Sequence, residues 1–148
     1  MKQNILVSAC LLGINCKYNG GANTSEALIK LKDSYNLIPF CPEVYGGLPT
    51  PREPSEIVGD RVISCDGTDV TECFERGAKE ALKTAQLYGC KLAVLKQRSP
   101  SCGFGEVYDG SFSGKTIKGD GITARLLKQN GIEIIGEDKI QDFFEINC

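Results

Sequence analysis

Short apolar runs alternate along this chain with longer segments in which apolar residues recur every three or four positions. The apolar runs are continuous rather than alternating, which is typical of strands buried on both faces. They occupy residues 4–10, 36–41, 92–95 and 132–136. Segments with helical spacing occupy residues 26–33, 69–88 and 123–129. Strands that alternate with helices predict an α/β fold, with a mostly parallel, Rossmann-like sheet and helices on both faces.

The segments between these elements predict less regular structure. Residues 42–54 contain four prolines and two glycines, so we expect a stiff irregular loop there. Residues 61–67 resemble a strand followed by a turn, as in half of a hairpin. Residues 105–108 and 115–117 flank a polar, glycine-rich segment, which predicts a small hairpin or a flap. No repeat or linker interrupts the chain, so residues 1–148 are expected to form a single domain.

The composition restricts the possible chemistry of the protein more than it restricts its possible fold. The chain has eight cysteines and no histidine, which excludes Ser-His and Cys-His catalysis and every metal site that contains histidine. A general acid or base must therefore be Asp, Glu, Lys, Tyr or Cys. The net charge of −2 argues against a general nucleic-acid binder, which would need a basic face.

The distribution of apolar residues also predicts where the protein works. No apolar signal segment precedes the first predicted strand, and no apolar run approaches the length of a membrane span. We therefore expect a cytoplasmic protein without membrane contact. In the reducing cytoplasm a cysteine serves as a thiolate ligand or as a nucleophile rather than as half of a disulfide.

Three cysteines lie at the ends of predicted strands. Cys10 and Cys41 end the first two strands, and Cys102 follows the strand 92–95 in the turn Ser99-Pro100-Ser101-Cys102-Gly103. Because ligands of open parallel sheets bind beyond the carboxyl ends of the strands, these thiols should meet in one place. Three thiols there predict a metal site, although three buried cysteines without a function are the alternative.

The pattern of cysteines favours iron over zinc. Structural zinc prefers four closed ligands and often paired Cys-x-x-Cys spacing, which this chain lacks. An iron–sulfur cluster is also commonly held by four cysteines, and three would leave one iron open to a substrate. Cys16 is either a fourth ligand or a nearby thiol. The remaining cysteines are expected to be core or surface residues: Cys65, Cys73, Cys90 and Cys148.

Polar residues flank the same strand ends. Glu43 lies two residues after Cys41, and a carboxylate beside a desolvated site can exchange protons near neutral pH. Ser99 and Ser101 either contribute to the site or only bond to their own turn. Arg52 and Arg98 also fall in these loops, where surface charge is the more common role of an arginine.

Four motifs in order resemble the thiouracil desulfurase family. The resemblance extends from residue 4 to about residue 136. The motifs are Val7–Gly13, Cys16–Gly20, Cys41–Glu43 with Gly46–Arg52, and Lys96–Gly103. The chain has Lys17 and Asn19 where many relatives carry Arg and Asp. The resemblance implies a [4Fe-4S] cluster bound by Cys10, Cys41 and Cys102.

The resemblance also implies a reaction and its catalytic residues. The expected reaction converts a thiolated pyrimidine such as 2-thiouracil to the oxo base plus sulfide. The family's catalytic carboxylate maps onto Glu43 and its catalytic serine onto Ser101, with Ser99 as the alternative. Substrate-binding or supporting roles are expected for Ser8, Ser99, Arg52 and Lys96.

Two other functional classes stay open at this point. The protein could be a non-catalytic carrier of an iron–sulfur cluster or of sulfide. It could also be a sulfurtransferase that carries a persulfide on Cys16 or Cys102. The expected partner is a small thiolated base, and thiolated tRNA is the alternative substrate.

Overall fold

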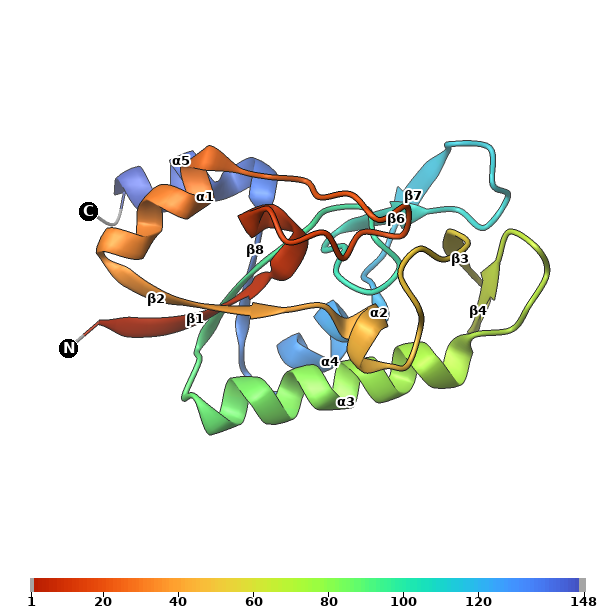
Figure 1. Ribbon diagram of the computed structural model, residues 1–148, viewed down its shortest axis with the longest axis horizontal. Coiled ribbons are helices and arrows are strands. Elements are labelled where there is room, and N and C mark those ends of the chain that lie inside the picture. Colours follow the sequence, from red (N-terminus) through yellow and green to blue (C-terminus); the bar gives the residue numbers. More distant parts are fainter. Residues whose placement is uncertain (1, 147–148) are drawn as a thin grey trace.

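The computed structural model describes residues 2–146 and contains a parallel sheet of four strands in the order β2–β1–β5–β8. The strands are β1 (Gln3–Ser8), β2 (Tyr35–Phe40), β5 (Leu92–Leu95) and β8 (Glu133–Gly136). The crossovers pass through α1 (Glu26–Lys30), α3 (Thr71–Leu87) and α4 (Ile122–Gln129). The predicted α/β fold with a parallel sheet is therefore confirmed (Figure 1).

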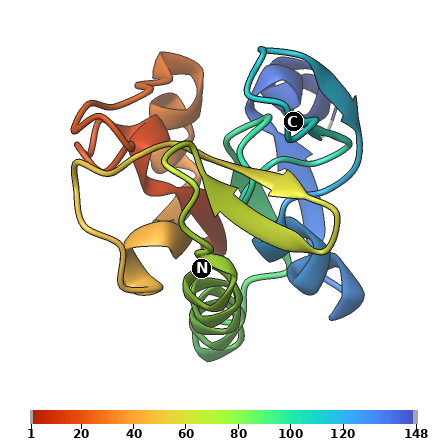
Figure 2. The ribbon, with the colours of Figure 1, turned by 90° about the vertical axis from the view of Figure 1, so that its right-hand side faces the viewer.

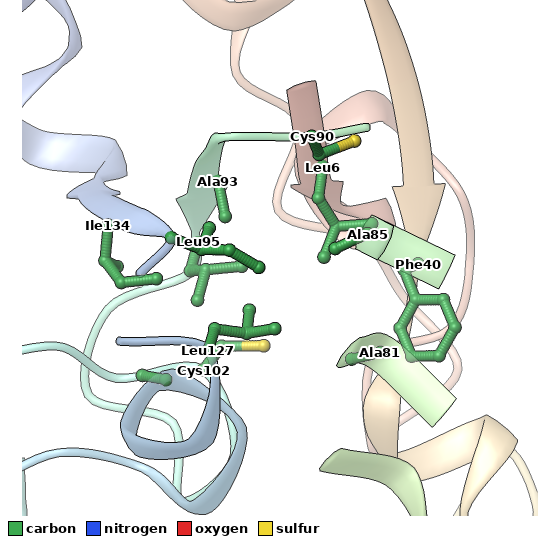
Figure 3. Close-up of a cluster of buried hydrophobic side chains, with 12 residues drawn as sticks. Leu6, Phe40, Ala81, Ala85, Cys90, Ala93, Leu95, Cys102, Leu127 and Ile134 are labelled. Atoms are coloured by element: carbon green, nitrogen blue, oxygen red, sulfur yellow. The ribbon is translucent and has the colours of Figure 1, made fainter. Parts of the chain in front are cut away.

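Helices cover both faces of the sheet because the strand side chains alternate in direction. Leu6 and Ala93 point to the face covered by α3 and α4, where they pack with Ala81 and Leu127. Figure 3 shows this cluster, with the side chain of Cys102 among its apolar neighbours. Ile5, Val7 and Val94 point to the opposite face, which α1 and α5 (Ile140–Ile146) cover. Local signals support these helices; for example, the Ser25 hydroxyl accepts the Leu28 N–H and caps α1.

Two antiparallel hairpins lie beyond the carboxyl ends of the parallel strands, at the right-hand side of Figure 1. One pairs β3 (Ser55–Val58) with β4 (Arg61–Ser64), and the other pairs β6 (Glu106–Tyr108) with β7 (Thr116–Lys118). Figure 2 shows the β3–β4 hairpin crossing in front of the sheet. The hairpins thus close the end of the molecule where the predicted site residues lie.

The structure corrects the expectation of an irregular loop over residues 42–54. A short helix, α2 (Pro42–Tyr45), begins there, because proline fits the first helical position, where no N–H is needed. The same segment leads into strand β3, which the sequence pattern did not predict. The strand expected over residues 4–10 ends at Ser8, and Cys10 lies in the 3-10 helix η1 (Ala9–Leu12).

Smaller differences concern the remaining boundaries. The helix expected over residues 26–33 is α1 followed by the 3-10 helix η2 (Leu31–Asp33), and η3 (Glu137–Lys139) precedes α5. Within residues 2–146, no helix combines the length and the apolar character that a bilayer span requires.

Candidate active site

The carboxyl ends of β1, β2 and β5 open into a cavity of about 460 Å³. Cys10 reaches it from η1, Cys41 lies between β2 and α2 as the N-cap residue of α2, and Cys102 lies in the turn after β5. The fold therefore brings together three thiols that are separated by up to 92 positions in the sequence, as 102 − 10 shows. Neighbouring parallel strands end at one edge of the sheet, which is why these residues meet.

The three thiols lie close enough to shift one another's pKa, but they do not surround a single metal-ion position. Burial raises the pKa of Cys10 and that of Cys102, the latter to about 12, and the charge of Cys41 adds to both shifts. Among the described residues, no three Cys, His, Asp or Glu side chains are grouped tightly enough to bind one metal ion. An iron–sulfur cluster takes its thiolates on different irons, so thiols spaced around a cavity fit such a cluster.

Each of these thiols also has a polar neighbour. The Asn23 side-chain amide donates to Cys10 Sγ over 3.5 Å, and the Ser101 hydroxyl lies 3.8 Å from Cys102 Sγ. Hydrogen bonding to Cys16 lowers the pKa of Cys41 to about 6, while the same interaction raises the pKa of Cys16. Donors of this kind favour the thiolate, which is the form that binds metal.

Cys16 lies in the same cavity as the three strand-end cysteines. Its side chain is buried, and its backbone carbonyl is 3.8 Å from Cys41 Sγ. This position is compatible both with a fourth ligand and with a nearby thiol, the two roles expected from the sequence.

Glu43 and Ser101 form the polar wall of the cavity. Glu43 lies in the first turn of α2, and its Oε2 accepts a hydrogen bond of 3.0 Å from the Ser101 hydroxyl. The Ser99 hydroxyl is hydrogen-bonded to that of Ser101, with its Oγ 2.9 Å from Ser101 Oγ. The Ser99 oxygen also accepts the N–H groups of Ser101 and Cys102, so it shapes the turn that carries them.

Arg52 is not the surface charge that the sequence favoured. Its side chain is only 6% exposed, and its Nε donates to Glu43 Oε1 over 3.0 Å. The Nη2 group donates to the Cys16 carbonyl over 2.9 Å, and Nη1 donates to Thr50 Oγ1 over 3.1 Å. Arg52 thus fixes the catalytic candidate Glu43 and the loop of Cys16 in one arrangement.

Ser8, at the end of β1, and Lys96, directly after β5, connect these two strands by a hydrogen bond. The Ser8 hydroxyl is buried, accepts the Lys96 N–H over 2.9 Å and also lowers the pKa of Cys102 by hydrogen bonding. Lys96 Nζ forms a 2.7 Å ion pair with Glu137 in η3. Both residues line the cavity, as does Arg98.

Residues missed by the sequence analysis include Asn23, which lines the cavity, and Glu137, the ion-pair partner of the cavity residue Lys96. Asn23 carried only the general signal of a polar, glycine-rich loop. Glu137 carried none, because it lies 41 positions after Lys96 in the sequence. The cavity wall on the side of the hairpins was missed as well; it includes Glu56, Tyr108 and Phe112.

Three other cysteines lie outside this cavity. Cys90 is buried among the apolar residues between α3 and the sheet, Cys73 is half-buried, and Cys65 is exposed. These positions agree with the core and surface roles expected from the sequence. Cys148 lies outside the described residues.

Comparisons with known proteins show which family the chain belongs to. The family model described as 2-thiouracil desulfurase matches residues 5–139. A protein of Bacillus subtilis (strain 168), described as uncharacterized protein YbbK, is 45% identical, over 93% of this chain and 98% of its own length. A solved structure described as the [4Fe-4S]-dependent thiouracil desulfidase TudS is 43% identical. It superimposes with a TM-score of 0.91, covering 98% of this chain and 97% of its own. The chain therefore belongs to the 2-thiouracil desulfurase family.

Proposed function

We propose that this protein is an iron–sulfur enzyme that converts thiolated pyrimidines such as 2-thiouracil to the oxo base plus sulfide. The main support is that Cys10, Cys41 and Cys102 line one cavity whose wall carries the hydrogen-bonded pair Glu43–Ser101. Membership of the family and the description of TudS as [4Fe-4S]-dependent support the same cofactor and reaction.

In this proposal Cys10, Cys41 and Cys102 hold a [4Fe-4S] cluster. Held by three cysteines, such a cluster would leave one iron without a protein ligand and would supply Lewis acidity toward the thiocarbonyl sulfur, as metals do toward carbonyls. The neighbouring Asn23 and Ser8 support two of these thiolates by hydrogen bonds. Their contribution is to favour the deprotonated form that a ligand needs.

The proton transfers are assigned to Glu43 and Ser101. The overall change is a hydrolysis: one water replaces the sulfur at the ring carbon, and the sulfur leaves as sulfide with no net redox change. Glu43 Oε2 accepts a proton as water attacks, and the Ser101 hydroxyl, 3.0 Å away, relays a proton or orients the ring. Arg52 holds the carboxylate through its other oxygen, which leaves Oε2 directed to Ser101.

The cavity favours a small substrate. Its volume of about 460 Å³ lies within the range of sites for small molecules, roughly 300 to 1,000 Å³. The net charge of −2 gives no general attraction to a polyanion such as tRNA. A free thiolated base is therefore the proposed substrate.

The carrier alternatives have less support in the structure. A protein that only carries a cluster has no use for the Glu43–Ser101 pair. A persulfide carrier needs an accessible thiolate, whereas the Cys102 side chain is buried and burial raises its pKa to about 12.

Anaerobic reconstitution with iron and sulfide tests the proposal. We expect about four irons per chain, broad absorption near roughly 400 nm and release of sulfide and uracil from 2-thiouracil. Glu43→Ala should keep its iron and lose at least about 100-fold in turnover, the typical contribution of a general acid or base. Tight stoichiometric zinc without iron would contradict the cofactor, and sulfide release by Glu43→Ala at the wild-type rate would contradict the role of Glu43.

A further inference from the structure

The tip of the β6–β7 hairpin forms one wall of the cavity. Tyr108 at the end of β6 and Phe112 and Gly114 in the connecting loop line it, and Glu56 of β3 lines it beside them. Figure 1 shows this hairpin next to β3, at the end of the molecule to which the parallel strands point. The aromatic residues Tyr108 and Phe112 thus lie on a hairpin that is separate from the segments that carry the cysteines, Glu43 and Ser101.

A single carboxylate attaches this tip to β3. Glu56 Oε1 accepts the Gly110 N–H over 3.0 Å and the Phe112 N–H over 3.2 Å. Gly110 has φ +91°, and a Cβ there would lie 2.7 Å from the Ile57 carbonyl oxygen. The backbone of the tip therefore lies directly against β3, in a position that a larger residue than glycine would prevent.

Phe112 has a conformation that local sequence preferences do not favour. Its φ is +57°, which is rare for a bulky residue, and the residue is 39% exposed while it lines the cavity. Burial in the core therefore does not account for this backbone conformation. Glu56 accepts the N–H of Phe112 itself and that of Gly110 two residues before it, and Phe112 lines the cavity in this conformation.

We propose that Phe112 covers the pyrimidine ring of the substrate and that Glu56 is the positioning residue that holds it there. This inference rests on the proposed function, since it assigns a binding role toward the same thiolated base. A flat heteroaromatic ring stacks well on an aromatic side chain, and such stacking is tolerant of ring substituents. The side chain of Phe112 therefore acts in binding, whereas Glu43 and Ser101 act in the chemistry.

Variants of Phe112 test the stacking role in the reconstituted protein. We expect Phe112→Ala to weaken uracil binding, measured by calorimetry, by about 5- to 100-fold and to raise KM for 2-thiouracil by a similar factor. The iron content and kcat should change little, and Phe112→Tyr should restore binding. Ile117→Ala is the matched control, because Ile117 is on the same hairpin, is half exposed and does not line the cavity.

Variants of Glu56 test the positioning role independently of activity. Glu56→Ala should speed hydrogen exchange at the Gly110 and Phe112 amides by roughly tenfold and raise KM as Phe112→Ala does. Glu56→Gln keeps an acceptor oxygen, so it should largely restore both the slow hydrogen exchange at these amides and the wild-type KM. Unchanged exchange in Glu56→Ala would overturn the positioning role.

The outcomes separate this inference from the proposed function. If the wild type releases sulfide and Phe112→Ala matches it in uracil binding and KM, the inference is wrong and the proposed function stands. If the loaded wild type neither binds uracil nor releases sulfide from 2-thiouracil, the proposed function fails and the inference fails with it.

Discussion

At the scale of single residues, the site depends on side chains that each hold more than one group. Arg52 joins Glu43 to the Cys16 carbonyl, and Ser101 joins Glu43 to the thiol of Cys102. The Arg52 guanidinium is buried and donates to four acceptors, so it is rigid, because any movement would leave a polar group unpaired. The position of the carboxylate is therefore set before any substrate binds.

The two neighbouring thiols of Cys16 and Cys41 should differ in their effect on iron. Cys41→Ser removes one of three proposed ligands, so we expect iron content and sulfide release to fall together. Cys16→Ser should keep both, because Arg52 holds this loop through the Cys16 backbone and not through its thiol. Iron assay and sulfide release on both reconstituted variants make the comparison. Equal iron loss in the two would indicate a four-cysteine cluster and favour a carrier over the enzyme.

At the scale of elements, glycines allow the short helix α2 to lie against α3. A Cβ on Gly77 of α3 would collide with the Pro42 carbonyl, and one on Gly46 would collide with the Cys73 carbonyl. The two helices therefore touch through backbone atoms. Since Cys41 precedes α2 and Glu43 lies within it, this contact positions both residues at the cavity.

Gly77→Ala should therefore destabilise the protein, although alanine is the better helix former by about 1 kcal/mol. We expect the free energy of unfolding to fall by about 1–3 kcal/mol, the usual cost of overpacking, and sulfide release to fall as α2 shifts. Urea unfolding measures the first effect. Lys79→Ala, at an exposed position of the same helix, is the control and should change stability by less than about 0.5 kcal/mol. Wild-type stability in Gly77→Ala would show that α2 adjusts freely.

At the scale of the whole molecule, the proposed cluster would connect three of the four parallel strands. Cys10, Cys41 and Cys102 follow β1, β2 and β5, which form one side of the sheet. A ligand that binds the folded chain but not the unfolded chain raises the stability of the fold. Loading should therefore stabilise the whole domain and not only its loops.

We expect the reconstituted protein to melt about 5 °C or more above the metal-free protein under anaerobic conditions. Removing the iron by oxidation and chelation should reverse the shift. Cys41→Ser should show little shift. Cys90→Ala should keep it, because Cys90 is a core residue away from the cavity. Circular dichroism during heating measures each of these samples, and equal melting temperatures with and without iron in the wild type would contradict the prediction.

The sequence by itself determined the parallel strands, the longer helices and the candidate chemistry. The continuous run Leu92–Leu95 and the helical spacing within 69–88 depend on local periodicity, which is visible without a fold. The absence of histidine limited the general acid or base to Asp, Glu, Lys, Tyr or Cys, and the position of Cys41 and Cys102 at strand ends predicted a site of thiolates. That these side chains share one cavity followed from the rule that parallel strands end at one edge.

Only the tertiary structure decided which charged side chains pair and where the hairpins lie. Arg52 could not be recognised as buried, because its burial depends on Glu43 and on a carbonyl 36 positions away. Strand β3 has four residues and includes the charged Glu56, so its local pattern is weak and its pairing with β4 defines it. The bonds from Glu56 to the tip that carries Phe112 join segments 54 and 56 positions apart. Such contacts depend on long-range packing, and local propensity carries no information about them.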